Sequence, residues 1–360
     1  MKIAILSFYS GINRRGVETW TYEIANLLRG KHQVVVFQNG LAEKDSKYEI
    51  ISLSLHYERN KKEKLFALQK RAFLDYKSRK IALFTLKILP KLWKGNFDII
   101  IPTDGGWEPA FVRILTWLKR RKMIVVGHAG IGWDDKNNLW CFPDCFVALS
   151  SFAKIWAKKV NPFVKIEYIS DGVDLQKFNP VGEKTEIDLV KPIVMAVGAL
   201  ERTKRIDLII KAVSKMGNAS LLVVGRGELK GEIGTLGKKL LGKRFLLKEF
   251  DHNDMPKVYR TCDVFVSASL PYFSFEMVIL EAMATKLPVV ANDDAIRREI
   301  VGNAGVFVDP TDTDSFAKDI NDVINIDWGD ELRKQAEKFS WDIILDKYEN
   351  LFKELVKSKH

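Results

Sequence analysis

The sequence predicts a two-domain α/β protein in which each domain is a doubly wound, Rossmann-like parallel sheet. Short and fully apolar runs alternate with amphipathic helical segments, and this alternation starts again after residue 180. Fully apolar strands are typical of parallel sheets that helices cover on both faces. The length of 360 residues also favours two domains, because single hydrophobic cores rarely grow so large.

The first half opens with an apolar strand, a glycine-containing loop and a helix. The strand is expected at 3–8 and the loop at 10–18, and apolar residues then recur at helical spacing from Trp20 to Leu28. The further strands expected in this half are 33–37, 97–101, 123–126 and 145–149. We therefore expect an N-terminal domain over residues 1–180.

The second half repeats this organisation. The charged stretch 181–191 lacks apolar periodicity and is expected to be a linker. Six apolar runs then alternate with helical segments: 193–197, 219–224, 245–247, 264–266, 289–291 and 306–308. They predict a C-terminal domain over 181–340, and a last amphipathic helix, 341–360, is expected to return to the N-terminal domain. Ligands of such sheets bind at the carboxyl ends of the strands, so a cleft between the two domains is expected.

The composition excludes several classes of protein. It is 47% hydrophobic and 29% charged, with 23 Gly and 11 Pro, which excludes disordered and collagenous chains. Cys141, Cys145 and Cys262 are too few for a disulfide framework and lack metal-ligand spacing, so we expect reduced thiols. No run of 18 apolar residues occurs, and residues 1–9 resemble a buried strand more than a signal peptide. We expect a soluble, cytoplasmic protein.

The net charge of +11 is unevenly distributed. Residues 1–180 carry 30 Lys and Arg against 17 Asp and Glu, whereas residues 181–360 carry 27 against 29. Residues 57–96 alone hold 12 basic and 3 acidic side chains. This asymmetry indicates that the two halves have different partners.

The most informative segment covers residues 273–290. A helix is expected to end near Thr285, Pro288 prevents its continuation, and an apolar strand follows. Glu281 lies in the middle of this helix among apolar neighbours, and a carboxylate buried there would need a partner. Taken alone, the segment is also compatible with a glutamate on the solvent-facing side.

Glu281-Ala-Met-Ala-x-x-x-Pro-Val-Val resembles the nucleotide-sugar signature of glycosyltransferase family 4, whose members are retaining enzymes of the GT-B fold. Further segments are similar to this family in the same order along the chain: 15–18, 169–174 with Phe178, 197–207 and 222–227. The resemblance implies the GT-B fold and transfer of a sugar from a nucleotide-diphosphate sugar to an acceptor hydroxyl. It also implies retention of configuration and no metal or other cofactor.

The resemblance implies that Lys204 neutralises the leaving diphosphate, with help from Arg202 and Arg205. Cationic side chains can stabilise such an anion, and the N-terminus of the helix that follows would favour it as well. A solvated loop lysine is the alternative. Gly16 would let the backbone approach the diphosphate or the sugar closely, although a plain turn glycine is also possible.

Two further roles follow from the resemblance. Glu281 would accept hydrogen bonds from the two ribose hydroxyls of the donor nucleotide, which suits a carboxylate. His128 follows an apolar strand at its carboxyl end and would lie beside the donor sugar and the reacting centre. A lone histidine is otherwise more often structural.

The chain departs from the family at the sugar end of the predicted site. Phe273 stands where the family has the first glutamate of a pair, Glu276 where a small residue is usual, and Ala199 where many relatives have an arginine. Residues 273–276, which are Phe273, Ser274, Phe275 and Glu276, are still expected to contact the donor. For Glu276, a position unrelated to the sugar pocket is the alternative. A degenerate nucleotide-sugar or membrane-binding protein without turnover, or an epimerase of the same fold, is the alternative.

The basic segments 57–96 and 112–122 contain large apolar residues between their lysines and arginines. Such a surface could bind anionic lipid headgroups and bring a glycan or lipid-linked acceptor to the protein, which would then be peripheral on the inner face of the cell membrane. Two helices with cationic faces in water are the alternative. No nucleic-acid-binding motif occurs, so nucleic acid is not an expected partner.

Overall fold

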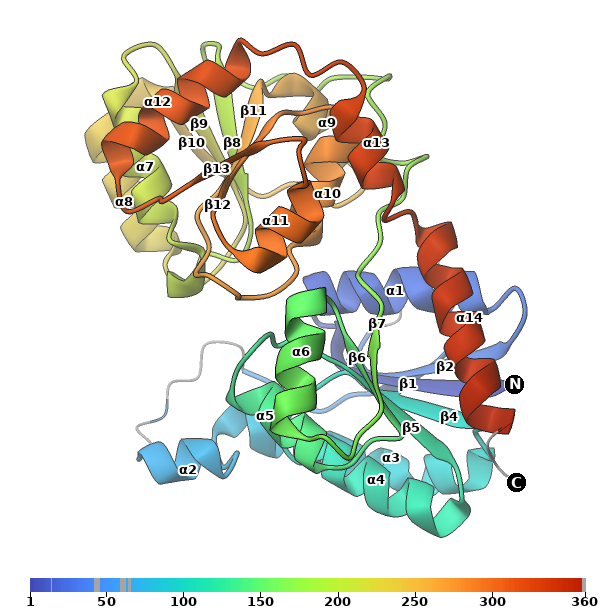
Figure 1. The fold of residues 1–360 in the computed structure, drawn as a ribbon. Coiled ribbons are helices and arrows are strands. Elements are labelled where there is room, and N and C mark those ends of the chain that lie inside the picture. Colours follow the sequence, from blue (N-terminus) through green and yellow to red (C-terminus); the bar gives the residue numbers. More distant parts are fainter. Residues whose placement is uncertain (14, 42–45, 59–62, 64–65, 358–360) are drawn as a thin grey trace. The chain divides into compact units, whose positions relative to one another are not determined.

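The computed structural model describes residues 1–357 except 14, 42–45, 59–62 and 64–65. The chain forms two compact units (Figure 1). Unit 1 comprises Met1–Ser170 and Ile344–His360, and unit 2 comprises Asp171–Ile343. Each unit is an α/β layer structure, with helices packed on a parallel sheet, as the sequence predicts.

Unit 1 contains a parallel sheet with the strand order β3-β2-β1-β4-β5-β6-β7. Its strands are β1 (Lys2–Gly11), β2 (Gln33–Gly40), β3 (Glu49–Leu53), β4 (Ile99–Pro102), β5 (Lys122–Val126), β6 (Cys145–Ala148) and β7 (Ile166–Tyr168). The central strands are almost completely buried, which explains their continuous apolar sequences. The edge strands β3 and β7 are not among the predicted strands, because β3 is only partly buried and β7 has three residues.

Helices surround this sheet. They are α1 (Gly16–Leu28), α2 (Ala67–Arg71), α3 (Tyr76–Gly95), α4 (Glu108–Lys119), α5 (Trp133–Trp140), α6 (Ser151–Val160) and α14 (Trp341–Lys357). Helix α14, at the C-terminal end of the chain, packs against residues near the N-terminus. Its Glu349 Oε1 lies 2.8 Å from Nε2 of His32, and Tyr348 packs edge-on against Trp20 of α1.

Unit 2 contains a second parallel sheet, with the strand order β10-β9-β8-β11-β12-β13. Its strands are β8 (Ile193–Val197), β9 (Ser220–Val224), β10 (Phe245–Lys248), β11 (Val264–Ser267), β12 (Val289–Asn292) and β13 (Val306–Val308). Its α-helices are α7 (Ile206–Lys215), α8 (Lys230–Leu241), α9 (Met255–Thr261), α10 (Met277–Ala284), α11 (Ala295–Val301), α12 (Thr313–Ile324) and α13 (Glu331–Glu337). Short 3-10 turns, η1 (Arg202–Lys204) and η2 (Gly242–Arg244), complete the unit. Every strand predicted for this half is present.

The strand orders fix where a ligand is expected in each unit. In unit 1 the chain moves outward from β1 to β3 and returns on the other side of β1 with β4. In unit 2 it moves from β8 to β10 and returns beside β8 with β11. Such reversals leave a crevice at the carboxyl ends of the two adjacent strands, where ligands of open α/β sheets bind.

The boundary between the units differs from the predicted position after residue 180. Residues 171–180 pack with unit 2, because the Val173 N–H donates to the carbonyl of Phe339 at 2.9 Å. Arg333 Nη2 also donates to the carbonyl of Leu175 at 2.8 Å. The predicted boundary is therefore ten residues too late, since these long-range contacts leave no local signature.

Within the described residues, no helix combines the length and the apolar character needed to cross a membrane. Cys141, Cys145 and Cys262 are free thiols. Burial raises the pKa of Cys141 to about 11 and that of Cys145 to about 12.

Candidate functional site

The loops after β8 and β9 approach each other closely enough to require glycine. Gly198 and Gly225 have φ angles of +158° and +152°. A Cβ atom on Gly225 would lie 1.9 Å from the carbonyl oxygen of Gly198, so no other residue fits there. The aliphatic stem of Lys204 runs past Gly198, at 3.6 Å from the position of a Cβ there. The Lys204 side chain thus passes the carboxyl end of β8.

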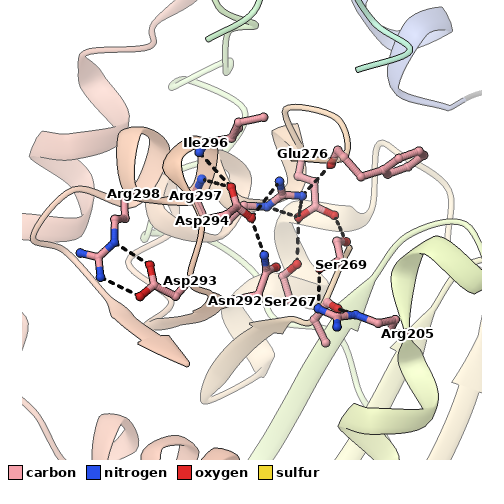
Figure 2. A network of polar contacts seen from close by, with 12 residues as sticks. Arg205, Ser267, Ser269, Glu276, Asn292, Asp293, Asp294, Ile296, Arg297 and Arg298 are labelled. Carbon is pink, nitrogen blue, oxygen red and sulfur yellow. Dashed lines mark hydrogen bonds and ion pairs between the residues drawn. The ribbon is translucent and has the colours of Figure 1, made fainter. Parts of the chain in front are cut away.

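Lys204 forms a shielded ion pair across the point where the strand order reverses. Its Nζ contacts Oε1 of Glu276, and the two side chains are 14% and 2% exposed. Ser269, which follows β11, donates to the same oxygen at 2.5 Å. Ser267, the last residue of β11, donates to Oε2 at 2.8 Å (Figure 2). Residues that follow β8 and β11 therefore meet at one carboxylate.

Arg297 completes a charge cluster, which we define as Lys204, Glu276, Asp294 and Arg297. The fully buried guanidinium of Arg297 contacts Glu276 Oε2 through Nη2 at 2.9 Å and Nε at 3.2 Å. Asp294 lies 3.4 Å from Arg297 Nη1 and caps α11 by accepting the N–H groups of Ile296 and Arg297. Two cations thus balance two carboxylates, as buried charges require.

The charge cluster keeps Glu276 ionised and turned inward. Burial alone would raise the pKa of Glu276, but the nearby cations Lys204 and Arg297 outweigh it and hold the pKa well below its usual range. Side chains of the protein bind both carboxylate oxygens. In this structure both oxygens of Glu276 are thus bound by Lys204, Ser267, Ser269 and Arg297, and its expected contact with a donor stays a prediction.

The segment before α10 has an unusual backbone. Tyr272, Ser274 and Glu276 have φ angles of 62°, 52° and 63°, a conformation that non-glycine residues rarely adopt. Arg297 holds this segment because its Nη2 also donates to the carbonyl of Phe273 at 2.7 Å. The conformation of residues 272–276 is thus fixed by the same arginine that binds Glu276.

The other predicted donor residues of this region have different surroundings. The half-buried ring of Phe273 lies beneath Lys204, with Nζ 5.7 Å from the ring centroid. Arg205 donates to the carbonyls of Ala268 and Ser269 at 2.6 and 2.8 Å, so its guanidinium supports the end of β11. Arg202 is exposed. Phe275 is buried and packs against Phe339 in the interior.

Glu281 lies in the second turn of α10 and is only 8% exposed. The alternative of a solvent-facing glutamate is therefore wrong. Tyr259 of α9 donates its hydroxyl to Glu281 Oε2 at 2.8 Å, and burial together with this carboxylate raises the pKa of the tyrosine. The sequence predicts that a buried Glu281 needs a partner, but it does not identify Tyr259.

In unit 1 the structure brings His128 together with the helix that begins at Gly16. Trp20, one turn into α1, packs edge-on against the imidazole of His128 at a centroid distance of 4.9 Å. His128 Nε2 is shielded from solvent and has no hydrogen-bond partner among the described residues. Burial lowers the pKa of His128 to about 3, so the ring is neutral at physiological pH. Gly16 itself is exposed at the N-terminus of α1.

Sequence reasoning did not identify the carboxyl groups at the reversal point of unit 1. Asp104 follows β4 and accepts the N–H of Phe8 at 2.7 Å. Burial and, more weakly, Glu18 raise its pKa to about 7 although the Phe8 N–H opposes them. Glu108 is fully buried and accepts the N–H of Asp104 at 3.1 Å. The polar, glycine-rich stretch 103–106 directly after a predicted strand is the signal that could have indicated this group.

The chain is similar in sequence and in fold to known glycosyltransferases. Residues 191–325 match the family described as Glycosyl transferases group 1. A phosphatidyl-myo-inositol mannosyltransferase from Mycolicibacterium smegmatis is 25% identical over 213 residues, which are 55% of this chain and 54% of that protein. Its counterpart from Mycobacterium tuberculosis is 30% identical over 183 residues, which are 48% and 47% of the two chains. The chain thus matches about half the length of these relatives.

Two solved structures match over nearly the whole chain. Sucrose-phosphate synthase from Thermosynechococcus elongatus has a TM-score of 0.79 at 19% identity and 99% coverage of both chains. HepE from Anabaena, solved with UDP and glucose, has a TM-score of 0.77 at 17% identity, covering 98% of this chain and 99% of that one. The protein thus has the GT-B fold of glycosyltransferases. Residues 191–325, which match the glycosyl transferases group 1 family, contain the charge cluster and Glu281.

Proposed function

We propose that the protein transfers a sugar from a nucleotide-diphosphate sugar to an acceptor hydroxyl. The observation that carries this proposal is the ammonium group of Lys204, held by Glu276 at the reversal point of the unit 2 sheet. This position lies within the part of the chain that matches the glycosyl transferases group 1 family.

The chemistry of Lys204 suits a diphosphate leaving group. An ammonium has three N–H donors, so Lys204 can bind Glu276 and still donate to phosphate oxygens. Helix α7 begins at Ile206, two residues after Lys204, and its N-terminus adds partial positive charge. Negative charge develops on the diphosphate as the glycosidic bond breaks, and preorganised cations and N–H groups stabilise it. On this proposal no metal or other cofactor is needed.

The remaining roles follow from the resemblance to family 4. Glu281, oriented by Tyr259, would accept the ribose hydroxyls of the donor. His128 and the start of α1 at Gly16 would contribute from unit 1, with His128 acting as a neutral hydrogen-bonding group because its pKa is low. Retention of the sugar's configuration is part of the proposal through this resemblance alone.

We further propose a glycan or lipid-linked acceptor and a peripheral position at an anionic membrane, with the protein on the cytoplasmic side. The two mannosyltransferase relatives are named for a lipid, phosphatidyl-myo-inositol. In unit 1, Trp93 of α3 and Trp117 of α4 are 46% and 58% exposed. A cation lies 4.8 Å from each ring: Lys119 Nζ from Trp93 and the Arg113 guanidinium from Trp117. Aromatic and basic side chains are typical of membrane-contacting surfaces. Residues 59–62 and 64–65 of the basic segment 57–96 lie outside the described residues.

The test is release of free nucleoside diphosphate from a panel of uridine, guanosine and adenosine diphosphate sugars without acceptor. We expect slow release from at least one donor, because water can attack the donor in place of the acceptor hydroxyl. Lys204→Ala should abolish this release. Tight donor binding without release on any donor would contradict the proposal and favour a degenerate binding protein.

A further inference from the structure

The surroundings of Phe273 bear on which sugar the proposed donor carries. Our inference rests on the proposed function, in which Lys204 binds the diphosphate. The phenyl ring lies 5.7 Å from Lys204 Nζ, and the sugar is attached directly to the diphosphate. The half-buried ring of Phe273 is therefore among the first groups that the sugar meets.

The backbone of Phe273 is held in place by its neighbours. Its carbonyl accepts a hydrogen bond of 2.7 Å from the fully buried Arg297. The residues on both sides, Tyr272 and Ser274, have left-handed backbone conformations that a non-glycine residue keeps only when its surroundings enforce them. The backbone that carries the ring is thus clamped.

The phenyl ring of Phe273 accepts no hydrogen bond from a sugar hydroxyl, and the carboxylates of the charge cluster are engaged by other groups. Glu276 binds Lys204 and Ser269 through Oε1, and Ser267 and Arg297 through Oε2. Asp294 caps α11 and contacts Asn292 and Arg297. A sugar hydroxyl that faces Phe273 would lose its hydrogen bonds to water and receive none from the ring.

We propose that Phe273 is a specificity-determining residue that selects a donor sugar lacking the hydroxyl that faces its ring, which is a deoxy sugar. A carbon-bound hydrogen or a methyl group packs against the phenyl ring without loss, whereas a hydroxyl is desolvated. Replacing a hydroxyl by an apolar group at an apolar contact is expected to change affinity about 10- to 100-fold.

The experiment measures donor binding by calorimetry, so it does not depend on turnover or on the acceptor. The probes are UDP-glucose and GDP-mannose, each with its 3-, 4- and 6-deoxy counterparts. For the wild-type protein we expect one deoxy donor to bind about 10- to 100-fold more tightly than its parent. Phe273→Glu should reverse this preference, so that the parent sugar binds more tightly than the deoxy sugar, because the hydroxyl can donate a hydrogen bond to the new carboxylate. Phe273→Leu, the matched apolar control, should keep it.

The outcomes separate the two proposals. Tighter binding of the parent sugars than of every deoxy donor, or the same preference in wild type and Phe273→Glu, overturns the inference and leaves the proposed function intact. Failure of all donors and of UDP, GDP and ADP to bind the wild-type protein overturns both. Affinity for UDP or GDP, measured in each variant, shows whether the nucleotide site is still folded.

Discussion

Glu276 occupies a backbone conformation that glycine would adopt without strain. The left-handed conformation costs a residue with a side chain about 1–2 kcal/mol. Hydrogen bonds to a charged group contribute roughly 1.5–3 kcal/mol each, and Glu276 makes such contacts with Lys204 and Arg297. These contacts act against both the backbone strain and the cost of burying the carboxylate, and they exist only when the residue at this position is acidic.

The half-buried imidazole of His128, whose Nε2 is shielded from solvent, makes the stability of the folded protein dependent on pH. The unfolded chain binds this proton near pH 6.5, whereas burial lowers the pKa in the folded state to about 3. The unfolded state thus binds more protons in this range. The stability present above pH 6.5 is lost as the pH falls toward 3, by at most about 1.4 kcal/mol per pH unit.

The variant His128→Gln, which cannot take up this proton, tests the effect. Between pH 7 and pH 5 the wild type should lose up to about 2 kcal/mol more free energy of unfolding than the variant. Urea unfolding followed by tryptophan fluorescence measures this, since most tryptophans lie in unit 1. Equal losses would mean that His128 is not held neutral.

Among the elements, strands that consist of a continuous apolar run can be predicted from the sequence. Contacts between residues far apart in the chain cannot. The buried central strands are predictable because each is an apolar run between turn residues, whereas the half-exposed β3 is not. The sequence also predicts that Glu281 needs a partner, because it is a carboxylate among apolar residues of a helix. The contact between Glu276 and Arg297 joins the ends of two elements through residues 21 positions apart, and no local pattern indicates it.

Helix α4 offers a test of backbone strain at an element boundary. Its C-cap residue Arg120 is exposed and has a φ angle of 52°, where glycine is favoured. Arg120→Gly should raise the free energy of unfolding by about 0.5–1 kcal/mol, because relief of the strain exceeds the entropic cost of glycine. Arg120→Ala keeps a Cβ atom and should not stabilise the protein. Urea unfolding compares the variants, and equal stabilities for glycine and alanine would contradict the assigned conformation.

At the scale of the molecule, the excess positive charge lies in the residues of unit 1, while the charge cluster of unit 2 is neutral. The charge distribution is fully readable from the sequence. Its concentration on surfaces with exposed tryptophans, with cations stacked on their rings, becomes apparent only in three dimensions. This combination underlies the proposed membrane contact.

Vesicle flotation with neutral and anionic lipid tests that contact. We expect binding to anionic vesicles at 0.1 M salt and release at 1 M, because the Debye length falls from about 10 Å to about 3 Å. The double variant Lys91→Gln with Lys94→Gln, next to Trp93, should weaken binding by about 2 kcal/mol. The control pair Lys238→Gln with Lys239→Gln, on α8 of unit 2, should bind like wild type. Equal weakening by both pairs would argue against a specific surface on unit 1.

Calorimetry of Lys204→Ala tests whether Lys204 binds the diphosphate of the donor. UDP and GDP are titrated beside uridine and guanosine, and Lys211→Ala, an exposed lysine on the following helix, is the control. We expect Lys204→Ala to weaken diphosphate binding by about 1.5–3 kcal/mol, roughly 10- to 150-fold, with little change for the nucleosides. Lys211→Ala should leave both unchanged. Equal weakening of diphosphate and nucleoside by Lys204→Ala would contradict the account, because the lysine would then act through the loop rather than through its charge.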